Sequence, residues 1–438
     1  MRFPDRSRIE VAPTPRLTTR DERDRLLRAA GLNVYRLPPE SVALDLLGVP
    51  PARARPADVP LDHFRSEEMV REVFDFRHIL PTRHGRTAAH LLFSVLARAG
   101  DTVPNNLHLD PTRGQLEARG VIALPLPIDG ARRDPQFPGN LDPEALERTL
   151  REVGSDRVPL VLLTITDHSS GGQPVSLANA RAVSRVCRGF GVPLYFDARR
   201  FAENVLFIQE REEGERRREL IELARELFSY GDGALLSVEP EDFFDPGGFL
   251  ATNDDLVHQA IVRRVLRVEG LPPELDEQAG AVLGSLDEEP LRARVAQIRR
   301  LGELLEHGGV PVLHPVGGRA LYVDARAFAP HIPARRFPGQ ALTVALYRDF
   351  GIRAVEVGSL RFWTRDPITG EARLPGFELV RLTSPPASAA AAAADLWVGF
   401  LAEAILDLHR RREAIRGLRL LHDAPLLRHY TARLEEVD

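Results

Sequence analysis

Lysine is absent from this chain of 438 residues, and all 58 lysine-plus-arginine positions are arginines. Drift toward GC-rich codons can replace surface lysines by arginine without selection, so composition alone can account for many of these positions. A catalytic lysine is different, because a guanidinium stays protonated at any useful pH and cannot form an imine. Side-chain Schiff-base chemistry is therefore excluded. The α-amino terminus is the only primary amine that the sequence offers.

Other scarcities exclude further classes of protein. The single cysteine, Cys187, rules out an internal disulfide, and its place in a helical stretch (180–188) favours a packed free thiol over a nucleophile. No apolar run approaches the roughly 20 residues of a membrane span, and the first residues lack the pattern of a secretory signal, so we expect a cytoplasmic protein. The net charge of -5 is spread along the chain, which gives no reason to expect nucleic acid or a membrane as a partner.

Three short apolar runs, at 160–166, 192–197 and 234–237, predict buried strands of an α/β fold. Asp197 closes the second run, which places its carboxylate at the carboxyl end of a strand, where ligands of open α/β sheets bind. The alternative interpretation is that Asp197 caps the next helix. The charged stretch 211–228 predicts a solvated helix that carries no chemistry.

A distinctive motif follows each predicted strand. The first strand precedes Gly-Gly-Gln-Pro-Val-Ser (171–176), the second leads into Asp-Ala-x-Arg-Phe-Ala-Glu-Asn (197–204), and the third ends at Ser237, nine residues before Pro-Gly-Gly. In this order the motifs resemble the tryptophanase and tyrosine phenol-lyase family, which are pyridoxal-phosphate-dependent β-eliminating lyases. The similarity extends nearly from end to end, as far as His-Tyr-Thr-Ala-Arg at 429–433.

The resemblance implies the aspartate-aminotransferase-like fold of type I pyridoxal-phosphate enzymes. This α/β fold has a large domain with a mostly parallel sheet and an α+β small domain. Residues 1–48 would form an N-terminal arm that packs on the small domain, 49–290 the large cofactor-type domain, and 291–438 the small domain. Since this architecture builds its sites between subunits, a homodimer or homotetramer is expected.

The resemblance also implies a cofactor site. Gly85 and Arg86 match the phosphate-binding residues, at a helix start whose backbone amides suit an anion. Ser237 supplies a matching hydroxyl from the third strand. Asp197 matches the carboxylate that keeps the pyridine nitrogen protonated, and Arg200 matches an arginine beside the ring.

At several site positions the sequence departs from the family. Leu109 stands where the family has an aromatic ring that stacks on the pyridine, and His84 replaces a glutamine. His168 replaces the asparagine that hydrogen-bonds the ring oxygen. Arg381 keeps the family's arginine for the substrate carboxylate. The Schiff-base lysine aligns with Pro240, so the residue that holds the cofactor covalently in the family is missing.

The function expected from this pattern is a lyase-like enzyme on an amino acid, with aromatic amino acids suggested by ancestry. It would work without an internal lysine aldimine, around non-covalently held pyridoxal or pyridoxamine phosphate. The candidate catalytic residues are His84, His168 and Arg381, since imidazole titrates near neutral pH.

Two alternatives remain open. His84, His108 and His168 lie in segments that converge on the cofactor site in the family, and with nearby carboxylates they could bind a divalent metal such as iron, manganese, nickel or zinc. In the other alternative, the protein is a pseudoenzyme or scaffold that keeps the fold without catalysis. Loss of the lysine and of the stacking ring favours the scaffold, whereas Asp197 and Arg381 favour a live ligand site.

Overall fold

The computed structural model describes residues 18–46, 73–82, 85–108, 110–128, 134–166, 171–198, 200–237, 248–268, 286–365, 372–384, 391–422 and 428–437. By its internal contacts the chain divides into two compact units. The described residues between 73 and 295 form one, called here the large unit. The described residues of 18–46 and 296–437 form the other, the small unit.

A five-stranded sheet forms the centre of the large unit, with the order β2-β8-β7-β6-β5. Its strands are β2 (His78–Thr82), β5 (Val161–Thr164), β6 (Leu194–Asp197), β7 (Gly233–Ser237) and β8 (Gly248–Thr252). β5, β6 and β7 pair in parallel, and β8 runs antiparallel to both β7 and β2. Four strands therefore share one direction, which confirms the mostly parallel sheet predicted from the sequence.

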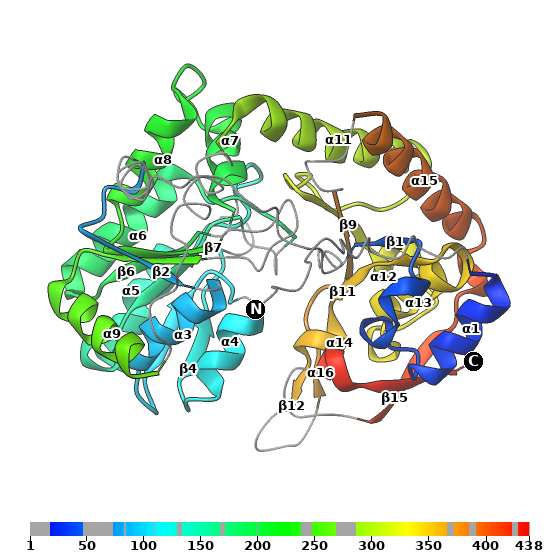
Figure 1. Ribbon diagram of the computed structural model, residues 1–438, viewed down its shortest axis with the longest axis horizontal. Helices are drawn as coiled ribbons and strands as arrows, with labels where there is room; N and C mark the ends of the chain where they lie inside the picture. The colour runs from blue at the N-terminus through cyan, green and yellow to red at the C-terminus, as the bar shows by residue number, and fades with distance from the viewer. Residues whose placement is uncertain are drawn as a thin grey trace, which may run out of the picture. The chain divides into compact units, whose positions relative to one another are not determined.

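Both faces of this sheet are buried, which explains why its strands are continuous apolar runs rather than alternating ones. Val161, Leu163 and Phe196 face one apolar core, while Leu162 and Tyr195 face another. The first core is shared with α5 (Pro143–Val153), α6 (Leu177–Phe190), α7 (Phe201–Arg211) and α8 (Leu220–Ser229). The second is shared with α3 (Gly85–Leu96), α4 (Asp110–Glu117) and α9 (Asp255–Val268). Figure 1 shows α6 and α8 on one side of the sheet and α3 and α9 on the other.

One predicted helix was wrong in its extent. The stretch 211–228 is not one solvated helix: α7 ends at Arg211, and α8 begins at Leu220. Between them Gly214 has a φ of +89°, which no continuing helix could contain. α8 also buries a full apolar face with the helical spacing 220, 223, 224, 227 and 228, so its charged residues cover only the outer side.

The small unit has an antiparallel sheet in the order β11-β14-β9, made of β9 (Ala320–Asp324), β11 (Val355–Val357) and β14 (Leu379–Thr383). Its main helices are α1 (Arg20–Ala29), α13 (Pro338–Phe350) and α15 (Ala391–Arg410), and they share one apolar core with the sheet. Short paired strands complete it: β1 (Leu44–Asp45) with β10 (Ile352–Arg353), β12 (Thr364–Arg365) with β13 (Ala372–Arg373), and β15 (Gly417–His422) with β16 (Arg433–Val437). This is the α+β composition that was predicted.

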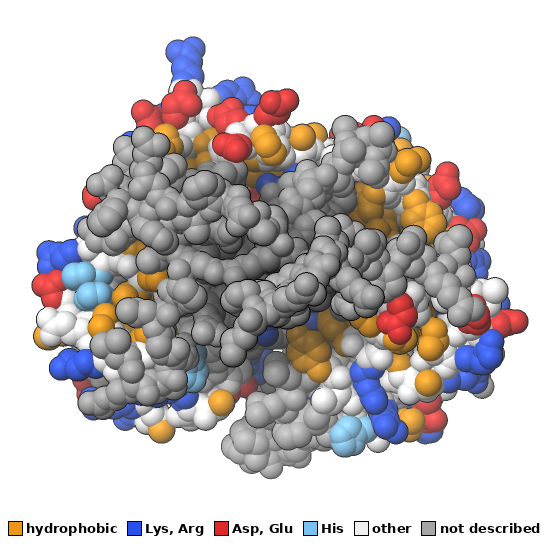
Figure 2. Space-filling view, in the orientation of Figure 1, with side chains coloured by type: hydrophobic (Ala, Val, Ile, Leu, Met, Phe, Trp, Pro, Cys, Tyr) orange, Lys and Arg blue, Asp and Glu red, His pale blue; other side chains and the backbone are white. Residues whose placement is uncertain are grey.

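Among the described residues, no helix is long and apolar enough to cross a membrane. Figure 2 shows acidic and basic side chains interspersed among the described residues of the visible face.

Candidate cofactor site

Asp197 is the last residue of β6, and its side chain is buried with only 1% exposed. Its backbone carbonyl accepts a hydrogen bond of 3.1 Å from Ile165 N, beside the end of β5. Its Oδ2 accepts a long contact of 3.5 Å from the Thr112 hydroxyl on α4. The N-cap position of α7 is occupied by Arg200, so Asp197 does not cap that helix. The interpretation that Asp197 caps this helix is therefore wrong, and the residue lies at the carboxyl edge of the sheet, where ligands of open α/β sheets generally bind.

Arg200 begins the turn into α7 and is also buried, with 8% exposed. Its backbone carbonyl accepts a hydrogen bond of 2.9 Å from the Thr166 hydroxyl at the end of β5. The carboxyl ends of two neighbouring strands are thus bonded to each other beside Asp197.

Two asparagines that sequence reasoning left without a role complete this edge. Asn105 is the last residue of β3 (Thr102–Asn105), which pairs in parallel with β4 (Ile122–Pro125), and Asn106 follows it. Thr164 N donates to Oδ1 of both asparagines, at 3.2 and 2.9 Å, and Asn106 Nδ2 donates to Thr164 O at 2.8 Å. The signal available in the sequence was the pair of adjacent asparagines directly after Thr-Val-Pro at 102–104.

The predicted phosphate-binding segment lies at the start of α3. Gly85 is the first residue of this helix and is buried, whereas Arg86 is exposed. Gln115 Nε2 donates to Arg86 O at 3.1 Å, which joins the first turn of α3 to α4. The amides of a first helical turn have no intrahelical acceptors, so this helix start can bind an anion.

The remaining predicted cofactor residues are placed only in part. Ser237 ends β7 and pairs with Gly248 of β8, but its side chain is not among those described. Leu109 lies outside the described residues.

Of the three histidines, only His108 is described; His84 and His168 lie outside the described residues. His108 is 3% exposed, and burial, with a smaller effect of the Arg113 charge, lowers its pKa to about 3. It is therefore a neutral imidazole at physiological pH. No group of three or more histidine, cysteine, aspartate or glutamate side chains in the described part of the chain could hold a metal ion. The metal hypothesis gains no support there.

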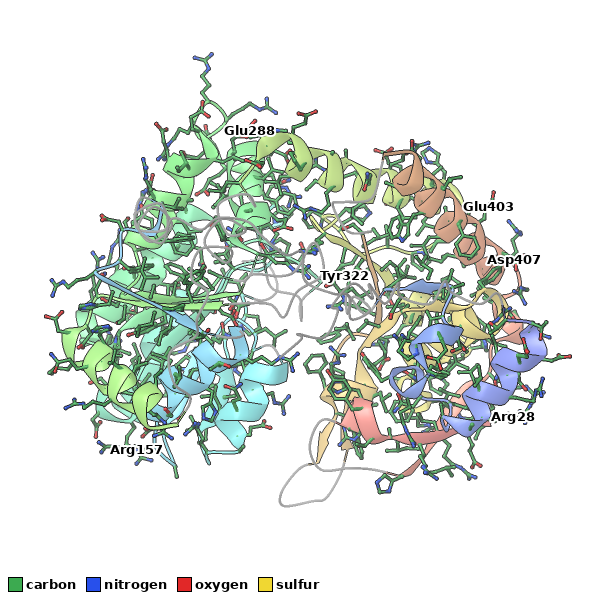
Figure 3. The ribbon with its side chains drawn as sticks, in the orientation of Figure 1. Arg28, Arg157, Glu288, Tyr322, Glu403 and Asp407 are labelled. Carbon is green, nitrogen blue, oxygen red and sulfur yellow. The ribbon has the colours of Figure 1, made fainter. Side chains whose placement is uncertain are left out.

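Arg381 is half-buried on β14 of the small unit, opposite Tyr322 of β9 and Val355 of β11. Figure 3 labels Tyr322 on its strand. Tyr322, Val355, Val357 and Leu379 form a small apolar cluster, so the strand positions around this arginine are apolar and aromatic. Tyr35 packs against the same cluster, and burial raises its pKa to about 12, against the opposing charges of Arg361 and Arg381.

Known proteins are similar in sequence to almost the whole of this chain. The family model for β-eliminating lyases matches residues 61–396. A tryptophanase from Hyphomonas neptunium is 41% identical over 98% of both chains. A tyrosine phenol-lyase from Symbiobacterium is 37% identical over 98% of both chains, and a tryptophanase from Rhodobacter capsulatus is 39% identical with the same coverage. The chain therefore belongs to the β-eliminating lyase family.

Solved structures agree on the fold. A protein described as an L-allo-threonine aldolase from Listeria monocytogenes superposes with a TM-score of 0.53 and 15% identity, covering 86% of this chain and 99% of that one. A structure described as SPT with PLP gives a TM-score of 0.51 at 15% identity, covering 78% and 76%. At this identity the likeness concerns the fold alone, and it confirms the predicted fold class of type I pyridoxal-phosphate enzymes.

Proposed function

We propose that this protein binds pyridoxal or pyridoxamine phosphate without a covalent link and acts on an amino acid. The observation that carries the proposal is Asp197, a buried carboxylate at the carboxyl end of β6 in a chain that has lost the family's lysine. A carboxylate in this position suits a protonated pyridine nitrogen, and burial strengthens a charge-assisted hydrogen bond to it. The Asp197 carboxylate therefore suits the ring of the cofactor, whereas the absence of lysine leaves no side chain for its covalent attachment.

The other residues have distinct tasks in this proposal. The first-turn amides of α3, at Gly85 and Arg86, would bind the phosphate together with Ser237. Arg200 would lie beside the ring, and Leu109 would cover one face of it. Arg381 would bind the substrate carboxylate, where its planar guanidinium suits a bidentate contact. When bound, the cofactor supplies an electron sink that acidifies the substrate carbon next to the amino group.

Proton transfer is the task that the missing lysine leaves open. We assign it to His84 and His168, since an imidazole with an ordinary pKa can accept and return a proton near neutral pH. The names of the relatives make tryptophan and tyrosine the first substrates to test. Homodimer or homotetramer assembly and a cytoplasmic location are further parts of the proposal, and light scattering tests the first.

The first experiment is a titration of the purified protein with each cofactor, followed by absorbance. We expect saturable binding of both cofactors, and no covalent adduct inside the chain after borohydride reduction with pyridoxal phosphate, because the α-amino terminus is its only primary amine. The variant Pro240→Lys serves as the positive control, since it restores an amine at the position that aligns with the family's lysine. A borohydride-stable adduct inside the unmodified chain would contradict the non-covalent proposal.

The second experiment replaces Asp197 by alanine. Losing a hydrogen bond to a charged group costs about 1.5–3 kcal/mol, so the affinity for pyridoxal phosphate should fall roughly ten- to 150-fold. Asp232→Ala is the matched control. Asp232 also holds β6, with Leu194 N donating to its Oδ2 at 2.8 Å, but at the opposite end of the strand. Equal affinity in the Asp197 variant would remove the basis of the proposal, and no binding by the unmodified protein would favour the scaffold.

A further inference from the structure

Thr166, next to the end of β5, has a backbone conformation that β-branched residues rarely adopt. Its φ is +56°, in the left-handed region, and its side chain is buried. Strained backbone of this kind persists only where the surroundings impose it, and it concentrates at functional sites. The strain occurs beside Asp197, since Ile165 N donates to the Asp197 carbonyl at 3.1 Å.

Asn204, on the first turn of α7, is hydrogen-bonded to the backbone of Thr166. Its side chain is completely buried, and its Oδ1 accepts hydrogen bonds from Thr166 N at 3.1 Å and from Val175 N at 2.8 Å. Its Nδ2 donates to Val175 O at 2.8 Å. One amide group therefore satisfies three buried backbone groups of two segments, the end of β5 and the residue before the N-cap of α6.

The same group of contacts includes the two predicted cofactor residues. Thr166 donates through its hydroxyl to Arg200 O at 2.9 Å, and Asn204 N donates to the same carbonyl at 3.4 Å. Asn204 is thus bonded to Thr166. Ile165 and Thr166 are bonded in turn to the Asp197 and Arg200 carbonyls, at the two ends of the turn into α7. Asn204 is the last residue of the motif at 197–204 that the sequence shares with the family, and the proposed cofactor contacts give this asparagine no role.

We propose that Asn204 is a positioning residue, which sets the geometry of Asp197 and Arg200 for the ligand through the strained Thr166. This inference rests on the proposed function, because the ligand used to test it is pyridoxal phosphate. Asn204 does not touch the ligand in this account. It fixes the backbone from which the pyridine-binding carboxylate projects, and a site of this kind loses affinity when its supporting hydrogen bonds are removed.

Asn179 provides the matched control. It is a buried asparagine of the same unit, its Oδ1 accepts from Leu141 N at 3.0 Å, and its Nδ2 donates to Leu141 O at 2.8 Å. Its substitution removes a comparable backbone clamp, which acts on Leu141 rather than on Thr166. Asn204→Ala and Asn179→Ala should therefore both lower the midpoint of thermal unfolding.

The two variants should differ in ligand binding. At a temperature where both are folded, we expect Asn204→Ala to bind pyridoxal phosphate about tenfold more weakly than the unmodified protein, and Asn179→Ala to bind it equally well. In combination with Asp197→Ala the Asn204 effect should largely disappear, since coupled residues are not additive. Equal losses of affinity in both asparagine variants, or full additivity with Asp197→Ala, would overturn the inference.

A second variant and a second measurement cover the remaining outcomes. If Asn204→Ala does not fold, Asn204→Asp keeps the acceptor for Thr166 N and Val175 N, and Asn179→Asp is its control. If the unmodified protein binds no cofactor, the proposed function fails, and hydrogen exchange then decides on the clamp. Faster exchange at Ile165, Thr166 and Asn204 in the Asn204 variant than in its control supports it, and unchanged exchange refutes it.

Discussion

Replacing Glu378 by glutamine should remove a pH-dependent loss of stability from the small unit. Glu378 is completely buried, and its carboxylate accepts hydrogen bonds from Ser359 N at 2.8 Å and Gly339 N at 3.4 Å. Glu356 is also completely buried. The two carboxyl groups lie close to each other, since a Cβ added to Gly358 would lie 2.6 Å from Glu378 Oε2 and 3.0 Å from Glu356 Oε1. Such complete burial disfavours the ionised form of the Glu378 carboxyl group.

Burial raises the pKa of Glu378 above its ordinary value of 4.5, against the lowering effect of the Ser359 and Gly339 hydrogen bonds and of the Arg326 charge. A group whose pKa is raised in the folded state stabilises the fold below its ordinary pKa and loses that contribution as the pH rises through the folded value. The free energy of unfolding should therefore fall as the pH rises above 4.5, by at most about 1.4 kcal/mol per pH unit for one proton.

The assay is urea unfolding of the unmodified protein and Glu378→Gln between pH 5 and pH 8. The variant keeps a carbonyl for Ser359 N and has no carboxyl to ionise, so the stability difference should shift in its favour as the pH rises. A pH-independent difference, or one that shifts the other way, would refute this reasoning.

Three further predictions concern single groups. For Glu226, burial acts to raise the pKa, but hydrogen bonds from Tyr230, Arg218 and Arg181 outweigh burial and lower the pKa. The stability difference between Glu226→Gln and the unmodified protein should therefore disappear as the pH falls below about 4.5. His108, whose pKa burial lowers to about 3, should stay neutral in NMR spectra from pH 7 to 5, and protonation near pH 6.5 would contradict its burial. Its contribution to the free energy of unfolding, measured by comparison with His108→Gln, should decline as the pH falls from 6.5 toward 3. Burial raises the pKa of the Cys187 thiol to about 12, so the native protein should not react with a thiol reagent at pH 8, whereas urea-unfolded protein should react fully. Rapid labelling of the native protein would show that α6 opens.

Local sequence patterns predicted much of the fold and part of the site. The three apolar runs became β5, β6 and β7 because a strand buried on both faces must be apolar along its whole length. The position of Asp197 followed from the same pattern, since a polar residue that ends such a strand lies at the edge of the sheet. The helix over 211–228 failed because charge alone does not show where a helix begins, whereas the apolar spacing after Leu220 does.

The sequence by itself determined that no side chain of this protein can form an imine, since that conclusion needs only the absence of lysine. Tertiary structure alone decided how the site is held. Asn204 meets Thr166 across 38 positions, and Asn105 meets Thr164 across 59. The neutrality of His108 and the proximity of Glu356 to Glu378 likewise depend on packing. Hydrogen bonds and desolvation depend on distance in space, and no local pattern of residues specifies which distant segments the folded chain brings together.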